Sequence, residues 1–163
     1  MDTLVQRVIN ELKAQLEAVE RRALSAAEGA THEESRPEDP KDTRGLETSY
    51  LAHGLAQRAK QLEDDIEMLR FLSTDRFDSE TPITTGALVT LEDDDGVEKC
   101  LLMLPCAGGT EVSHKARTVH VVTPGSPLGA ALLEKCEGDD VQVRIAGKMR
   151  EYVVSSVSNP SDP

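Results

Sequence analysis

The sequence predicts an α+β fold, in which an amino-terminal antiparallel helical hairpin precedes a small antiparallel β domain with one short helix. Apolar residues recur at steps of three and four through the first seventy positions, which is typical of amphipathic helices. After position 82 they alternate in short runs, which is typical of strands. Between two of these runs lies SPLGAALL, residues 126–133, a Ser-Pro turn that opens a helix.

The helical hairpin is predicted from two apolar stripes separated by a loop with two prolines. The first helix should span residues 2–28 and stop at Gly29, and the second should span residues 44–73, with the loop at 30–43. The first stripe consists of Val5, Val8, Ile9, Leu12, Leu16, Val19 and Ala23. The second consists of Leu51, Leu55, Ala59, Leu62, Ile66, Leu69 and Leu72. Each stripe is too narrow to bury itself, so the helices should pair over roughly 40 Å and project as a coiled coil, residues 1–75.

The β domain is predicted over residues 82–158, after a polar linker at 74–85. Strands 87–91 and 98–104 flank the acidic turn 92–96 and should form a hairpin. The remaining strands are expected at 118–123, 141–145 and 151–157, with the helix at 130–134. These elements predict a small sheet that wraps one helix.

The composition excludes several classes of protein. The 163 residues carry 30 acidic and 18 basic side chains, so a broad basic surface for bare nucleic acid is not expected. Three cysteines without CxxC spacing support neither a disulfide framework nor a zinc site. No signal peptide or membrane span is apparent, so we expect a cytoplasmic protein that does not bind membranes.

The order of these parts carries a family resemblance. A helical hairpin, a linker and a strand pair with an acidic turn precede SPLGAALL, EGDDVQV and EYVVSSV. This order resembles the Gre family of bacterial transcription elongation factors, in which a Ser-Pro-hydrophobic turn, a small-residue helix ending in Leu and a Gly-Asp pair precede two closing strands. The matching residues here are Ser126, Pro127, Leu128, 130–133, Gly138, Asp139, 141–145 and 151–157.

The resemblance implies a fold and a partner. The β domain should look like an FK506-binding protein and dock on RNA polymerase at the mouth of its secondary channel, and the coiled coil should reach toward the active centre. The docking candidates are Ser126, Pro127 and Leu128; a turn and helix cap is the alternative for Ser126, and core packing for Leu128. In cleavage-competent members, acidic tip side chains help hold a second Mg²⁺. Carboxylate oxygen is the ligand that this ion prefers.

The tip of the hairpin is expected between residues 33 and 50. Cleavage-competent members carry a motif similar to Gly-Asp-Leu-x-Glu-Asn shortly before a Tyr, which is Tyr50 here. The acids upstream are Asp42 and Glu47, five residues apart rather than three, and the Glu-Asn pair is missing. We expect Asp42 and Glu47 to assist the polymerase Mg²⁺, with Glu38 and Asp39 as further candidates if the loop folds over. A helix cap at Asp42 and a first-turn dipole partner at Glu47 are open alternatives.

Two basic residues complete the predicted site. Arg44 and Arg58 are candidates for contact with polymerase or RNA along the flank of the hairpin. The alternatives are a salt bridge from Arg44 to Glu47 or Asp39, and an ordinary exposed helix residue at Arg58.

The leading hypothesis is an elongation factor that stimulates polymerase to cleave backtracked RNA and so rescues stalled complexes. It has no catalytic residues of its own and no stably bound cofactor, shares Mg²⁺ with the polymerase, meets the RNA 3′ end only indirectly, and is expected to be a monomer. The alternative is a secondary-channel regulator that does not cleave. A prolyl isomerase is discounted, because residues 81–163 contain one aromatic side chain, Tyr152.

Overall fold

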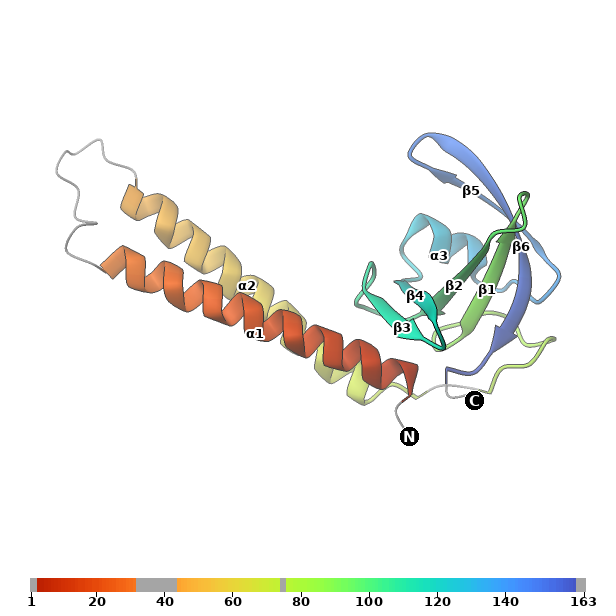
Figure 1. Ribbon diagram of the computed structural model, residues 1–163, viewed down its shortest axis with the longest axis horizontal. Helices are drawn as coiled ribbons and strands as arrows, with labels where there is room; N and C mark the ends of the chain where they lie inside the picture. The colour runs from red at the N-terminus through yellow and green to blue at the C-terminus, as the bar shows by residue number, and fades with distance from the viewer. Residues whose placement is uncertain (1–2, 32–43, 74–75, 161–163) are drawn as a thin grey trace. The chain divides into compact units, whose positions relative to one another are not determined.

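The computed structural model describes residues 3–31, 44–73 and 76–160 (Figure 1). Contacts divide the chain into two compact units, Leu12–Glu67 and a unit made of Met1–Glu11 and Met68–Pro163. The domain boundaries 1–75 and 82–158 stay a prediction. None of the helices in the described residues has the length and apolar character needed to cross a membrane.

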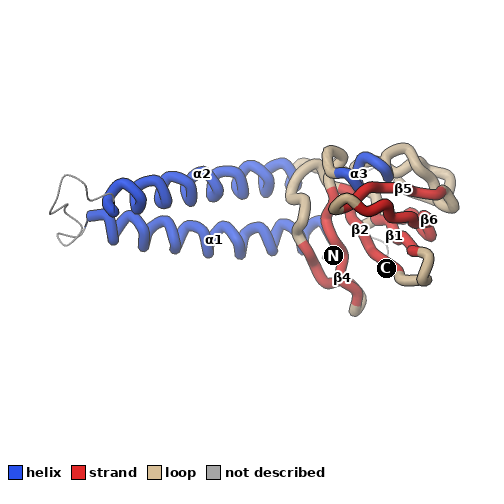
Figure 2. Tube along the Cα trace, turned by 90° about the horizontal axis from the view of Figure 1, so that it is seen from above, coloured by secondary structure: helices blue, strands red, loops and turns tan. Residues whose placement is uncertain are grey.

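Two long helices form the amino-terminal part of the chain. α1 (Leu4–Thr31) and α2 (Arg44–Arg70) lie side by side in Figures 1 and 2, which confirms the predicted helical hairpin. Burial in the two helices is deepest at Leu4, Val8, Leu12 and Leu62. Leu51, which the predicted stripe includes, is instead 55% exposed. The apolar residues of α1 beyond position 20 are mostly alanines, and small side chains offer little surface to cover a leucine.

Both helices end at residues other than those predicted. α1 continues past Gly29 to Thr31, because one glycine costs a helix only about 1 kcal/mol and does not by itself end it. α2 ends at Arg70, three residues before the predicted Ser73. There the backbone N–H of Leu72 donates to the carbonyl of Leu69 (3.4 Å), which closes a turn tighter than that of an α-helix.

The carboxyl-terminal part is a six-stranded sheet with one short helix, which confirms the predicted fold class (Figure 1). The strands run in the order β3-β4-β2-β1-β6-β5. Their bounds are β1 (Leu88–Asp93), β2 (Glu98–Met103), β3 (Glu111–His114), β4 (Arg117–Val122), β5 (Asp140–Ile145) and β6 (Lys148–Ser158). One pairing departs from the prediction of an antiparallel sheet, since β2 and β4 are parallel. The chain crosses from β2 to the edge strand β3 and returns through β4, so the sheet is mixed.

Local chemistry explains two hairpins of the sheet, of which the first was predicted. In the acidic turn between β1 and β2, the Asp93 carboxylate accepts hydrogen bonds from the N–H groups of Asp95 (3.1 Å) and Val97 (2.9 Å). Between β5 and β6, Ala146 and Gly147 both have positive φ, 49° and 79°, as a two-residue type I′ turn requires.

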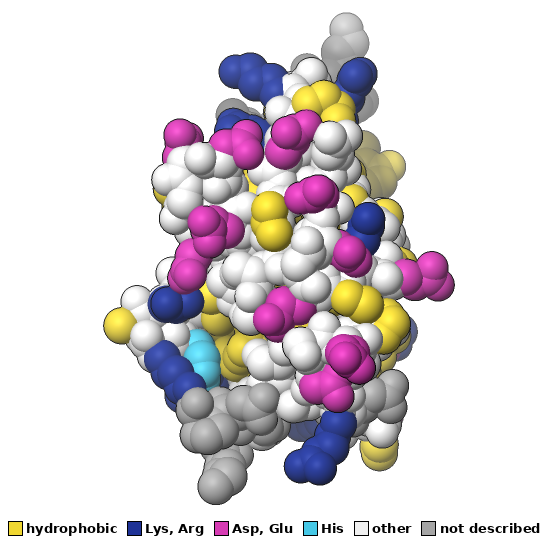
Figure 3. All heavy atoms as spheres, turned by 90° about the vertical axis from the view of Figure 1, so that its right-hand side faces the viewer, with side chains coloured by type: hydrophobic (Ala, Val, Ile, Leu, Met, Phe, Trp, Pro, Cys, Tyr) yellow, Lys and Arg dark blue, Asp and Glu magenta, His cyan; other side chains and the backbone are white. Residues whose placement is uncertain are grey.

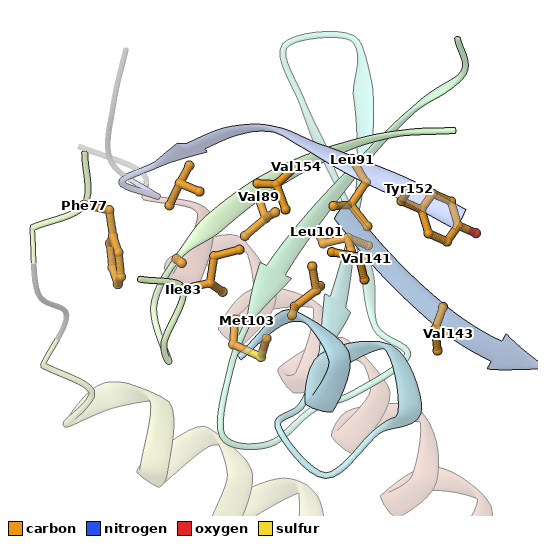
Figure 4. Close-up of a cluster of buried hydrophobic side chains, with 13 residues drawn as sticks. Phe77, Ile83, Val89, Leu91, Leu101, Met103, Val141, Val143, Tyr152 and Val154 are labelled. Carbon is orange, nitrogen blue, oxygen red and sulfur yellow. The ribbon is translucent and has the colours of Figure 1, made fainter. Parts of the chain in front are cut away.

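The short helix α3 (Pro127–Leu132) covers one face of the sheet, here called the core face. It begins earlier than the predicted 130–134, because Ser126 caps it directly. Figure 4 shows the buried cluster on this face. Apart from Phe77, Tyr152 and Met103, its members are aliphatic. The cluster consists of Phe77, Ile83, Ala87, Val89, Leu91, Leu101, Met103, Leu132, Val141, Val143, Tyr152, Val154 and Val157.

Candidate functional site

The Ser-Pro turn is fixed by its own hydrogen bonds. Ser126 has an extended backbone (φ −78°, ψ 153°), and its Oγ accepts a hydrogen bond from the N–H of Gly129 (3.1 Å). The same hydroxyl donates to the carbonyl of Thr123 (2.8 Å). Pro127 occupies the first turn of α3, where its missing N–H costs nothing. The predicted cap at Ser126 is therefore confirmed.

Gly129 allows this turn to close. A Cβ at this position would lie 1.9 Å from the carbonyl oxygen of Thr123 and 2.9 Å from Oγ of Ser126. No side chain fits such a distance, so only glycine lets the helix backbone approach the end of β4. The close approach holds Pro127 and Leu128 in one position above the sheet.

An open hollow of about 690 Å³ lies beside this turn, here called the core-face hollow. Its walls are mostly apolar, and all three predicted docking residues line it. Pro127 is exposed, whereas Leu128 is half-buried and also packs against the core cluster. The core-packing interpretation of Leu128 is therefore confirmed, and its docking role stays a prediction. The lining residues are Lys99, Leu101, Gly108, Gly109, His120, Val121, Val122, Thr123, Ser126, Pro127, Leu128, Arg144, Ile145 and Ala146.

The charged groups of the core-face hollow are all basic. Lys99 Nζ lies 3.2 Å from the hydroxyl of Tyr152 and 5.1 Å from the centroid of its ring, which orients the ammonium group. His120 Nδ1 lies 3.1 Å from Oε1 of Glu111, an ion pair when the imidazole is protonated. Elsewhere the surface is rich in carboxylates, as Figure 3 shows for one face, so the hollow differs from its surroundings in charge as well as in polarity.

Several lining residues could not be named from the sequence. Lys99, His120 and Arg144 come from three different strands. Alternation along β2 places Lys99 and Leu101 on the same face, and this is the signal available in the sequence. His120 joins them because the parallel register pairs it with Leu101. That pairing was not predicted.

The structure locates only part of the predicted tip. Glu47 lies in the first turn of α2 and is exposed, a position where a carboxylate interacts favourably with the helix dipole. Arg44 is the first residue of α2, and Arg58 is exposed further along it. Asp42 lies outside the described residues, as do Glu38 and Asp39. Within the described ranges, no three His, Cys, Asp or Glu side chains are grouped as metal ligands would be.

The carboxyl-terminal part matches a family model. Residues 78–159, which include the sheet, α3 and the core-face hollow, match the model described as "Transcription elongation factor, GreA/GreB, C-term". The chain belongs to the GreA/GreB family of transcription elongation factors. The resemblance of the Ser-Pro turn and the closing strands to the Gre family is confirmed.

Sequence comparison with known relatives agrees with this assignment. The chain is 28% identical over 156 residues to transcription elongation factor GreA of Neisseria meningitidis serogroup B, covering 94% of this chain and 90% of the relative. It is 33% identical over 101 residues to GreA of Xanthomonas axonopodis pv. citri, covering 62% and 61%. Among solved structures, Thermus aquaticus Gfh1 is similar at 22% identity and a TM-score of 0.41, covering 92% of this chain and 93% of that one.

Proposed function

We propose that this GreA/GreB-family chain docks on RNA polymerase through the core-face hollow, at the entrance of the secondary channel. The observation that supports the proposal is the position of Ser126, Pro127 and Leu128 on the wall of that hollow. An apolar centre with polar groups around it is the usual composition of the core and rim of a protein–protein interface. The rigid turn keeps the ordering cost of docking low, because Gly129 and the Ser126 cap fix it before the partner arrives.

We propose further that the docked chain stimulates the polymerase to cleave backtracked RNA. Glu47 and Asp42 would supply carboxylates to a Mg²⁺ ion shared with the polymerase, whose chemistry is to stabilise charge on the oxygens of the scissile phosphate. The exposed position of Glu47 suits a ligand that completes a site elsewhere. One carboxylate cannot hold Mg²⁺ on its own. On this proposal the chain is an accessory factor that binds the ion only together with its partner.

Cleavage is tested with backtracked elongation complexes, Mg²⁺ and the full-length protein. Shortened RNA should appear faster than with polymerase alone, and replacing Asp42 and Glu47 by Ala should abolish the acceleration. Binding without acceleration would leave a non-cleaving regulator. An unchanged rate in the double variant would show that other acids act.

Docking is tested separately at Pro127. Pro127→Asp places a charge on the wall of the hollow, and an acid in the first turn of a helix is tolerated. This variant should lose polymerase binding and keep its melting temperature. The matched control is Met149→Asp, at an exposed position of β6 that does not line the hollow. A photo-crosslinking residue at position 127 should label the polymerase at the channel entrance, and labelling elsewhere would contradict the proposed location.

A prolyl isomerase function receives no support from the core-face hollow. None of the residues that line it in the described part of the chain is Phe, Trp or Tyr. The ring of Tyr152 belongs to the core cluster, where it packs beneath Lys99 instead.

A further inference from the structure

A second hollow, of about 540 Å³, lies on the face of the sheet opposite the core face. It is here called the basic hollow. Three of its lining side chains are His, Lys or Arg, and none is acidic, although the chain as a whole carries a formal charge of −12. The lining residues are Leu88, Thr90, Cys100, His114, Lys115, Arg117, Val119 and Ser158.

The strand register builds the floor of the basic hollow. Thr90 pairs with Cys100, and Cys100 pairs with Val119, so these three side chains form a row across β1, β2 and β4. Leu88 lies two residues from Thr90 on the same face and pairs with Leu102. The floor is therefore apolar, with hydroxyl and thiol groups at its edge.

The hairpin between β3 and β4 supplies the bases on the rim. His114 pairs with Arg117, and the two-residue turn between them contains Lys115. Two cationic side chains, Lys115 and Arg117, and the imidazole of His114 are thus held within one turn of a hairpin. The positive potential of the two cations favours an anion at this rim.

Neighbouring groups extend the positive field. Arg7 of α1 donates from Nη1 to the carbonyl of Ser113 (2.7 Å), beside His114. Burial lowers the pKa of His114, and the charges of Lys115 and Arg7 lower it further. Arg117 meets one carboxylate, with 2.8 Å between its Nη1 and Oε2 of Glu98. A second anion could bind the guanidinium from the side of the hollow.

We propose that the basic hollow binds a small phosphorylated molecule, with its phosphate against Lys115 and Arg117 and its remainder over Leu88 and Val119. The fork of donors on Arg matches phosphate oxygens, and an ammonium adds a point charge. Thr90 and Ser158 can donate hydroxyl hydrogen bonds from the floor. The size of the hollow is that of sites for small molecules.

A compact ligand fits this surface better than a nucleic acid strand. A strand would continue beyond the hollow, where Glu98 is exposed on β2, on the same face as Cys100. The charge of Glu98 repels a polyanion. The basic groups are confined to one rim, which suits a single phosphate or pyrophosphate group.

The site is tested by titrating the ¹⁵N-labelled full-length chain with pyrophosphate and with ADP, with sulfate at equal ionic strength as the reference. Both probes should cause saturable amide shifts at Thr90, Cys100 and Arg117, and ADP should bind more tightly because its nucleoside can cover the floor. Lys115→Gln with Arg117→Gln should weaken binding about tenfold or more. Arg150→Gln, an exposed base of β6 outside the hollow, is the matched control and should change nothing.

The thiol of Cys100 gives a second readout, since its Sγ lies 3.9 Å from Nη1 of Arg117. For each cysteine, the labelling rate with a dianionic aromatic disulfide reagent is divided by the rate with a neutral one. This ratio should be larger for Cys100 than for Cys106 or Cys136. Pyrophosphate should slow labelling at Cys100 alone.

Shifts that do not saturate, or an equal loss in Arg150→Gln, would overturn the proposal. Equal affinity for ADP and pyrophosphate would show that the apolar floor does not contact the remainder of the ligand. An oligoribonucleotide that binds more tightly than ADP, with shifts beyond the hollow, would replace the small molecule by RNA. None of these measurements involves polymerase, so their outcome is independent of the proposed docking and cleavage.

Discussion

Beside the core-face hollow, Gly129 is the position where a single added methyl group should lower the stability of the fold most. Replacing it by Ala adds one methyl group, placed 1.9 Å from the carbonyl oxygen of Thr123. Ordinary contact begins at 3.4 Å, so the two backbones must separate by about 3.4 − 1.9 = 1.5 Å. Neither partner is a flexible side chain that could rotate away. The turn itself has to open.

The expected cost follows from what that opening disrupts. Overpacking of this kind costs about 1–3 kcal/mol. A separation of this size also breaks the hydrogen bond from the Gly129 N–H to Ser126 Oγ, and a lost helix cap costs about 1 kcal/mol. Together these give a loss of about 2–4 kcal/mol in the free energy of unfolding.

Urea denaturation followed by tyrosine fluorescence measures this loss, because Tyr152 is buried in the sheet whereas Tyr50 is 74% exposed. The matched control is Gly125→Ala, four residues earlier, where an added Cβ meets nothing within 4 Å. Gly125→Ala should keep the stability of the native chain to within about 0.5 kcal/mol. If Gly129→Ala proves as stable as Gly125→Ala, the close approach does not constrain the turn and the account of the docking surface fails with it.

Three further predictions concern the same domain. Ser126→Ala should lower the free energy of unfolding by about 1 kcal/mol in urea denaturation, since it removes the cap while leaving the backbone unobstructed. Met103→Ala should cost about 2–5 kcal/mol by the same measurement, because Met103 is fully buried in the core cluster. The hydrogen bond from the Thr81 hydroxyl, followed by that from the Glu80 N–H, lowers the pKa of Asp78 below its usual 3.8. The contribution of the Asp78 carboxylate to the free energy of unfolding is therefore present above pH 3.8 and is lost as the pH falls through the lower pKa of the folded state. Asp78→Asn should remove this part of the pH dependence of stability in acid.

The elements that the sequence predicted are those whose periodicity is local. α1 and α2 carry apolar residues at helical spacing over about five turns each, and β1, β4 and β6 alternate clearly. β3 was missed, since it has four residues, only one of them buried, and its turn contains neither Gly nor Asn. A strand that short is recognised by its partner β4, which a sequence does not display.

The sites were predictable to a different extent. The Ser-Pro turn is a contiguous motif, so Ser126, Pro127 and Leu128 could be named in advance. The two hollows could not be, because each draws side chains from several strands whose order depends on the parallel pairing of β2 with β4. Local sequence patterns do not determine the order of strands in a sheet. That order is decided by which long-range strand pairings are most stable.

The turn that the sequence did not reveal also gives a prediction of increased stability. Lys115 and Ala116 have φ of 47° and 63°, a left-handed conformation that costs a residue other than glycine about 1–2 kcal/mol. The corresponding turn between β5 and β6 uses Gly147 at its second position. Ala116→Gly would place a glycine at the same position of this turn. The change removes the backbone strain, and it lowers the free energy of unfolding by about 0.4–1 kcal/mol because glycine gives the unfolded chain more conformational freedom.

The net effect of Ala116→Gly should be a gain of up to about 1.6 kcal/mol in the free energy of unfolding. Ala116 is exposed, so the lost methyl group removes no buried contact that could offset the gain. Gly147→Ala is the reciprocal control and should lose a similar amount, because its φ of 79° becomes strained. Both changes leave the charges of the hairpins intact. A loss of stability in Ala116→Gly would show that the backbone strain lies in Lys115 instead. Lys115 lies on the rim of the basic hollow, so its backbone conformation sets the position of that rim.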